Sequence, residues 1–159
     1  MEQGTGVVEA IHLAGAHGEM PHAVGFAVAH AGRGLEGDRN FDDSDPDSCD
    51  ITLIEAEAFE KLMADHGLDL TPAASRRQVL VRGARLGEFI GRRFRVGEIE
   101  CEGEGRCEPC SHLVKLVGTP VVLKGLLHTG LRARIVTGGT IRRGDPVGLV
   151  AQRAGSPTA

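Results

Sequence analysis

Glycine supplies 23 of the 159 residues and is scattered along the chain without a regular period. Because glycine adopts backbone conformations that other residues avoid, scattered glycines are typical of a chain with many tight turns. Between the glycines lie short apolar runs with the alternation and length of β-strands. The chain is long enough to bury one core. These features predict a single, mainly β domain with a few short helices.

The apolar pattern predicts strands at residues 6–13, 24–28, 50–54, 78–82, 92–97, 98–104, 131–136 and 146–150. Gly138, Gly139 and Thr140 are expected to form a turn before the last of them. Strands outnumber helices, and no strand–helix–strand rhythm repeats along the chain. A closed or partly open mixed β-barrel is therefore expected, in place of a doubly wound parallel sheet.

Helices are expected at 55–66, at about 71–75, as one turn in 86–91, and as two short helices within 111–127. In the first of these, the apolar Ala56, Phe59, Leu62 and Met63 fall on one face at helical spacing, and Gly67 is a suitable stop.

Composition excludes several classes of protein. The net charge of -4 and the lack of Trp and Tyr argue against a nucleic-acid partner. No apolar run is long enough to cross a bilayer, and the N-terminus lacks a signal-peptide pattern. We therefore expect a cytoplasmic protein with no membrane partner. The domain is expected to span residues 1–150, and the small polar residues of 151–159 to form a disordered tail.

Residues 32–37 match the glycine pattern of dinucleotide-binding proteins, G-x-G-x-x-G. That motif requires a helix whose N-terminus faces the pyrophosphate. The acidic run that follows is unsuited to such a helix. We interpret the glycines instead as a tight, left-handed loop from which Arg33, Asp38 and Arg39 project.

The cysteines are Cys49, Cys101, Cys107 and Cys110, of which the last two form a close pair. A structural disulfide framework is not expected in a cytosolic protein of this size. A reactive thiol or a metal ligand is the better expectation for the close pair, and buried inert thiols for Cys49 and Cys101.

Several interpretations of the close pair remain open. Zinc bound by Cys107, Cys110, His112 and His128 has a ligand spacing unlike common zinc modules. A thioredoxin-like dithiol requires a strand–helix–strand setting, which is not evident around the pair. A single thiolate ligand for a soft metal is the third interpretation, and two buried structural thiols are the fourth. Cys110 precedes an apolar run at helical spacing, and a helix N-terminus would favour its thiolate.

Arginines are clustered although the chain is acidic overall. Arg132 and Arg134 would share one face of a strand, opposite the apolar Leu131, Ala133 and Ile135. Because guanidinium groups bind phosphate and other planar anions through two hydrogen bonds, this strip is a candidate anion contact.

Six segments taken in order resemble the MOSC family, named for the C-terminal domain of molybdenum cofactor sulfurase. They are GRGLEGDRN (32–40), ITLIEAEAFEKL (51–62), RRQVLVRGARL (76–86), IGRRFRVGEIE (90–100), RCEPC (106–110) and GLRARIVTGGTIRRGDPV (130–147). The resemblance implies a mixed β-barrel of the MOSC or pyruvate-kinase-barrel-like type and binding of the molybdenum cofactor, molybdopterin. Family members often carry His and Asn where this chain has Asn40 and Gln78, and both replacements keep hydrogen-bonding capacity.

The resemblance also implies roles for individual residues. The essential cysteine of the family maps to Cys110, as the molybdenum ligand and catalytic thiolate, with Cys107 as the alternative. Asp38 is the second residue with an implied catalytic role. The residues implied to line the cofactor pocket are Glu36, Asp38, Arg39, Arg76 and Arg77, with Arg132 near the cofactor phosphate.

Two functions of different class follow from the resemblance. In the first, the chain binds or carries the cofactor, or its sulfur, through a cysteine thiolate, with a molybdoenzyme as partner. In the second, it is a molybdenum-dependent reductase of N-hydroxylated compounds that takes electrons from an external electron-transfer protein. No aminotransferase-like domain is seen in this sequence, so pyridoxal phosphate is not expected. No ferredoxin-like cysteine segment is seen either, so an electron relay within the chain is not expected.

Overall fold

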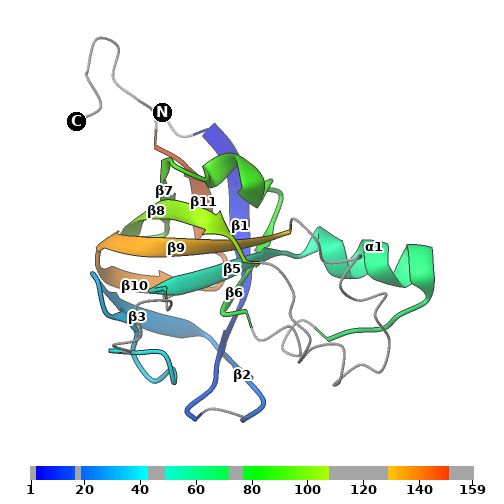
Figure 1. Ribbon diagram of the computed structural model, residues 1–159, viewed down its shortest axis with the longest axis horizontal. Helices are drawn as coiled ribbons and strands as arrows, with labels where there is room; N and C mark the ends of the chain where they lie inside the picture. The colour runs from blue at the N-terminus through cyan, green and yellow to red at the C-terminus, as the bar shows by residue number, and fades with distance from the viewer. Residues whose placement is uncertain (1–2, 17–18, 43–48, 72–76, 108–128, 151–159) are drawn as a thin grey trace.

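A computed structural model of the chain describes residues 3–16, 19–42, 49–71, 77–107 and 129–150 (Figure 1). Its strands are β1 (Gln3–Leu13), β2 (His22–Val24), β3 (Phe26–His30), β4 (Gly34–Leu35), β5 (Ile51–Glu55), β6 (Val79–Arg82), β7 (Arg93–Val96), β8 (Ile99–Arg106), β9 (Gly130–Thr137), β10 (Gly139–Arg142) and β11 (Pro146–Leu149). The helices of the described residues are α1 (Glu57–His66) and η2 (Leu86–Phe89), which is one turn of 3₁₀ helix. The helices expected at 71–75 and within 111–127 fall mostly or wholly outside the described residues.

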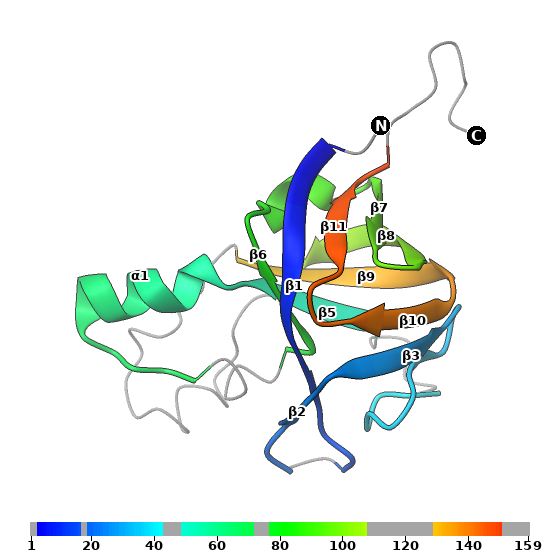
Figure 2. The same ribbon diagram turned by 180° about the vertical axis from the view of Figure 1, so that it is seen from behind.

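Seven strands close into a mixed barrel in the order β1-β6-β5-β9-β8-β7-β11, with β11 pairing back to β1 (Figures 1 and 2). β5 and β6 run parallel, and the other neighbours around the ring are antiparallel. β2 continues the sheet beyond the ring by pairing with the end of β1. The expected mixed β-barrel is therefore confirmed, and it is closed.

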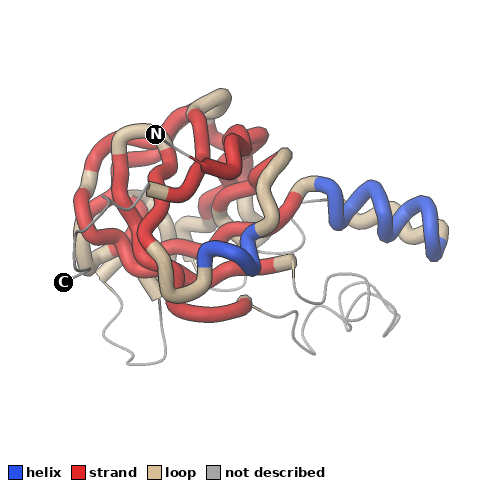
Figure 3. The backbone as a smooth tube through the Cα atoms, turned by 90° about the horizontal axis from the view of Figure 1, so that it is seen from above, coloured by secondary structure: helices blue, strands red, loops and turns tan. Residues whose placement is uncertain are grey.

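The parallel pair exists because α1 connects β5 to β6 as a crossover. α1 buries Phe59 and Leu62, as its spacing predicts, and also Ala58, whereas Met63, expected on the same face, is 52% exposed. The helix ends at Gly67. Gly67 has φ 66° and donates its N–H to the Met63 carbonyl, a left-handed cap that glycine forms without strain. α1 lies to one side of the ring in all three views (Figure 3). No helix in the described part of the chain has the length and apolar character to span a membrane.

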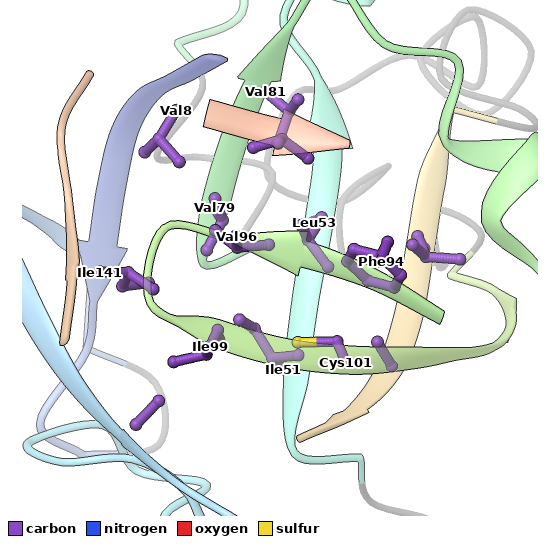
Figure 4. Close-up of a cluster of buried hydrophobic side chains, with 14 of the residues drawn as sticks. Val8, Ile51, Leu53, Val79, Val81, Phe94, Val96, Ile99, Cys101 and Ile141 are labelled. Atoms are coloured by element: carbon purple, nitrogen blue, oxygen red, sulfur yellow. The ribbon is translucent and has the colours of Figure 1, made fainter. Parts of the chain in front are cut away.

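The barrel interior is filled by alternate side chains of its strands. Residues from strands on different sides of the ring, such as Val79, Phe94 and Ile99, meet in one cluster (Figure 4). Cys101 belongs to this cluster and is fully buried. Burial raises the pKa of its thiol far above the usual value, so Cys101 stays protonated and packs as a small apolar side chain. This agrees with the inert role expected for it.

A second sheet has the strand order β10-β3-β4. The turn expected at Gly138–Thr140 was therefore wrong in part, because two of these residues belong to a strand of this sheet. Gly139 and Thr140 begin strand β10, in which Gly139 pairs with Ala29 and Thr140 with Val28. A Cβ atom at Gly138 would lie 2.6 Å from the Ala29 carbonyl oxygen. The glycines therefore permit close approach of two strands, which a sequence pattern does not distinguish from a turn.

We predict that acid destabilises the fold through His12, a β1 side chain that is 9% exposed. Burial and the nearby His22 lower the pKa of His12 below its usual value of 6.5. The unfolded chain therefore binds the proton at higher pH than the folded chain, and stability falls as pH drops below about 6.5. Urea unfolding at about pH 7.5 and about pH 5.5 measures the free energy of unfolding at each pH. We expect this free energy to fall less between the two pH values in His12→Gln than in wild type.

The exposed His66 is the matched control for this prediction, and His66→Gln should keep the wild-type difference. Equal acid losses in wild type and His12→Gln would show that His12 contributes nothing to the pH dependence.

Candidate functional site

The candidate site lies on the outer surface of the barrel, where β5, β9 and β8 are neighbours. Cys107 directly follows β8, and its backbone N–H donates to the Gly130 carbonyl at 3.0 Å. Arg132 lies on β9, opposite Thr52 of β5 on one side and Gly105 of β8 on the other. Cys49 lies two residues before β5, and its thiol is near enough to the Arg132 guanidinium for each group to shift the pKa of the other. We call these three residues the Cys49–Arg132–Cys107 cluster.

Strand alternation places Arg132 on this surface. Leu131, Ala133 and Ile135 point into the barrel and are buried, whereas Arg132 and Arg134 point outward. The shared face predicted for the two arginines is therefore confirmed, but their surroundings differ. Arg134 is exposed and pairs with Glu102 of β8 at 2.8 Å. Arg132 is half-buried and belongs to the cluster.

The end of β8 is shaped by an irregularity of register between Gly103 and Gly105. Such bulges bend a strand and redirect the side chains that follow. In β8 the bulge lies just before Cys107. Among the described residues, no atom lies within 4 Å of a Cβ atom placed at Gly105, so this part of the chain leaves the surface beside Arg132 open at that point. A Cβ atom at Gly103 would instead lie 2.2 Å from the Phe89 carbonyl oxygen.

The charges of the cluster follow from its surroundings. Burial lowers the pKa of the Arg132 guanidinium, the nearby Cys49, Cys107 and Glu104 raise it, and the net shift is upward. Arg132 therefore remains cationic. Burial raises the pKa of the Cys49 thiol, as does the nearby Cys107, and Arg132 offsets part of this shift. Cys49 is thus a neutral thiol near pH 7. Sequence spacing contained no sign that Cys49 lies beside Arg132.

Asp38, expected to be catalytic, is buried and accepts three hydrogen bonds. Its Oδ1 accepts from the backbone N–H of Ala14 at 3.1 Å, and its Oδ2 from that of Asn40 at 3.1 Å and from Nε2 of Gln78 at 2.8 Å. Gln78 also accepts the Thr52 N–H at 2.9 Å and donates its own N–H to Thr52 Oγ1 at 3.0 Å. This Asp38–Gln78–Thr52 network connects the loop at 32–42 to β5, at the position opposite Arg132.

The other expected pocket residues are spread around this network. Arg39 is half-buried, and its backbone N–H donates to the Ala14 carbonyl at 2.7 Å. Arg77 is half-buried directly before Gln78. Glu36 is exposed and pairs with His30. Arg76 and Cys110 lie outside the described residues.

The glycine loop has the left-handed conformations expected of it. Gly32, Gly34 and Gly37 have φ of 71°, 113° and 85°. Gly34 begins the short strand β4, and the next helix in the described chain is α1. Arg33 pairs with Asp42 at 2.6 Å and lies over the Phe41 ring. The loop is thus tied down by its own contacts, and the dinucleotide interpretation is excluded.

Among the described residues, no group of three or more His, Cys, Asp or Glu side chains is arranged to hold a metal ion. Of the four ligands considered for zinc, the described part of the chain includes Cys107 alone. The strand–helix–strand unit that a thioredoxin-like dithiol requires occurs once in this part, at β5-α1-β6, and it does not contain Cys107.

Comparisons with known proteins define the class. The sequence matches the MOSC domain over residues 38–148. The chain therefore belongs to the MOSC domain family, and the resemblance noted in the sequence is confirmed. A search of curated proteins found no match.

Solved structures share the fold. The YuaD protein from Bacillus subtilis is similar with a TM-score of 0.77 and 16% identity, over 94% of this chain and 97% of that one. YiiM from Geobacillus stearothermophilus is similar with a TM-score of 0.72 and 18% identity, over 92% of this chain and 75% of that one. YiiM from Escherichia coli has a TM-score of 0.66 and 17% identity, over 96% and 71% of the two chains.

Proposed function

We propose that this protein binds the molybdenum cofactor and holds it, or its sulfur, through a cysteine thiolate of the segment that follows β8. Cys110 is the proposed ligand, and Cys107 is the alternative. The observation that carries the proposal is the position of a half-buried, cationic Arg132 beside the start of that segment. Membership of the MOSC family supports the choice of cofactor.

The chemistry of the donor set fits this group. A cysteine thiolate is a soft ligand suited to a soft metal centre, and a guanidinium binds a phosphate group through paired hydrogen bonds. Gly105 leaves open surface beside Arg132, on the strand that leads to Cys107. When bound, the cofactor supplies the redox chemistry of molybdenum, and the protein supplies binding, orientation and access.

Different residues of the chain would bind the cofactor, line its pocket and position the neighbouring strand. Arg132 would bind the anionic part of the cofactor, and the Asp38–Gln78–Thr52 network would fix the strand beside it. Arg39, Arg76 and Arg77 are proposed to line the pocket near the loop at 32–42, with Glu36 at its exposed rim. Because each oxygen of Asp38 already accepts a hydrogen bond from a neutral donor, we propose that Asp38 acts chiefly by positioning the loop.

Removal of the ligand should remove the metal. In protein purified from a molybdenum-replete host, Cys110→Ser should lower the molybdenum content more than about tenfold, because the thiolate is lost. Cys107→Ser should retain molybdenum, and so should Cys101→Ala, the matched control in the barrel core. Metal content is measured by elemental analysis, and folding by thermal denaturation.

Each other outcome has a definite meaning. Loss of molybdenum in Cys107→Ser but not in Cys110→Ser moves the ligand to Cys107. Retention in both variants, or wild-type protein without molybdenum, rejects the proposal. Fully loaded protein should pass molybdenum cofactor or sulfur to a cofactor-free molybdoenzyme if the chain is a carrier. Turnover of an N-hydroxylated compound with an artificial electron donor would instead make it a reductase.

A further inference from the structure

We propose that His12 is a further ligand-contacting residue, whose imidazole binds the uncharged ring of the cofactor at the end of the site opposite Arg132. This inference rests on the proposed function, in which Arg132 binds the anionic part of the same ligand. It gives the site a second point of recognition, for the pterin ring. His12 precedes all six segments that carry the family resemblance, so no motif points to it.

A row of four side chains crosses the outer surface of the barrel, one from each of four neighbouring strands. The strands are β9, β5, β6 and β1, in that order (Figure 1). Arg132 of β9 lies opposite Thr52 of β5. Gln78, directly before β6, is joined to Thr52 by two hydrogen bonds of 2.9 and 3.0 Å. The backbone N–H of His12 on β1 donates to the Gln78 carbonyl at 2.7 Å and so continues the row.

Strand alternation turns the His12 side chain toward this row. Ile11 and Leu13, its neighbours on β1, pack inside the barrel. Ile11 pairs with Val79, which directly follows Gln78 and also belongs to the barrel core. Successive residues of a strand point to opposite faces, and residues directly opposite on antiparallel strands share a face. His12 and Gln78 therefore both point outward, on the same side of the sheet as Arg132.

The His12 ring is largely buried but not used by the described part of the chain. His12 is 9% exposed, and neither of its ring nitrogens has a hydrogen-bond partner among the described residues. No buried polar side-chain atom of those residues lacks a partner, so the His12 nitrogens reach the surface. A neutral imidazole offers one donor and one acceptor there. A ligand that bonded to both would do so in a mostly water-free setting, where hydrogen bonds are stronger than in open water.

The charges along the row define the class of ligand. Arg132 is cationic at one end, and Thr52 and Gln78 in the middle are uncharged. Burial and the nearby His22 lower the pKa of His12, so its imidazole is neutral near pH 7. The row therefore fits a molecule with an anionic group at one end and an uncharged, hydrogen-bonding ring at the other. A pterin that carries a phosphate group has this character.

The length of the row agrees with such a ligand. Three inter-strand spacings separate Arg132 from His12, about 14 Å along the sheet, which is long enough for a ring and a phosphate group in one molecule. An inorganic anion alone would reach Arg132 without reaching His12. The two ends of the row can therefore be tested separately.

The test uses the full chain without cofactor, and 6-hydroxymethylpterin and inorganic phosphate as probes. In ¹⁵N NMR spectra of labelled histidine side chains, the pterin should shift the ring nitrogens of His12 and leave those of the exposed His66 unchanged. Phosphate should leave the His12 nitrogens unchanged. His12→Phe keeps an aromatic ring without hydrogen-bonding atoms, so the Kd for the pterin should rise at least about fivefold, as expected for one lost hydrogen bond. The Kd for phosphate should stay at its wild-type value.

Two further variants are the controls. Glutamine keeps a donor and an acceptor, so His12→Gln should retain most of the affinity for the pterin. His22 lies opposite Leu13, on the other face of the sheet, so His22→Gln should bind the pterin as wild type does. Because the chain has no Trp and no Tyr, quenching of pterin fluorescence measures these Kd values with little background from the protein.

The inference is overturned if wild-type protein does not bind the pterin, if binding leaves the His12 nitrogens unshifted, or if His12→Phe keeps the wild-type Kd. If His12→Phe fails to fold, as seen by thermal denaturation, the shifts of the wild-type nitrogens decide. Molybdenum content separates this inference from the proposed function. Protein that contains molybdenum but whose His12 does not respond to the pterin contradicts the inference alone. A His12 that responds in a protein that never binds molybdenum contradicts the proposed function alone.

Discussion

Replacing Gly130 with alanine is expected to displace the backbone of Cys107 and to weaken both the fold and the proposed cofactor site. A Cβ atom at Gly130 would lie 2.2 Å from the Cys107 carbonyl oxygen, far inside contact distance. The obstacle is backbone on a paired strand end, and Cys107 also donates its N–H to the Gly130 carbonyl, so one residue must move. The expected loss of stability is about 1–3 kcal/mol, as for other overpacked sites.

Chemical denaturation and molybdenum content measure the two effects of Gly130→Ala. Gly25→Ala is the matched control, because no atom of the part of the chain that the structure describes lies within 4 Å of a Cβ atom placed at Gly25. We expect the control to keep wild-type stability and metal content. If Gly130→Ala did the same, the close approach of β9 to Cys107 would have no part in the site.

Replacing Asp38 with asparagine is expected to cost at least about 2 kcal/mol of folding stability. The carboxylate accepts hydrogen bonds from Ala14, Asn40 and Gln78 on its two oxygens. An amide offers one oxygen, and its NH₂ group would face a donor at the other position. At least one N–H group of the network would then lack an acceptor, which is more costly than the loss of a hydrogen bond at the surface.

Urea unfolding measures this change, with Asp42→Asn as the control. Asp42 pairs with Arg33 at the surface, where such pairs contribute at most about 1 kcal/mol. Asparagine also tolerates the positive φ of 59° at that position. Asp38→Asn could instead be as stable as wild type and yet abolish an activity of the cofactor-bound protein. Asp38 would then take part in the reaction, and the positioning role that we propose for it would be wrong.

Local sequence patterns are informative about the barrel because side-chain alternation and glycine act over a few residues. Alternation around Arg132 correctly predicted which side chains face the interior, and Gly67 correctly predicted the end of α1. The same patterns missed β10, because glycines that allow two strands to approach closely resemble glycines in a turn.

The candidate site was predictable only in part. Arg132, Asp38 and Gln78 were singled out from the sequence, but the hydrogen bond between Asp38 and Gln78 joins residues 40 positions apart. Cys49 shows why such contacts escape a linear pattern, because it follows no motif and meets Arg132 through the pairing of β5 with β9.

The sequence by itself determined that strands form, which of their faces are apolar, and which family motifs follow one another along the chain. These properties depend on neighbours within a few residues. Only the tertiary structure decided that β11 returns to β1 to close the barrel, that Asp38 is buried among three donors, and that Cys49 and Cys107 both lie near Arg132. Those features arise from strand order and register, which bring together residues too far apart in sequence for local patterns to relate.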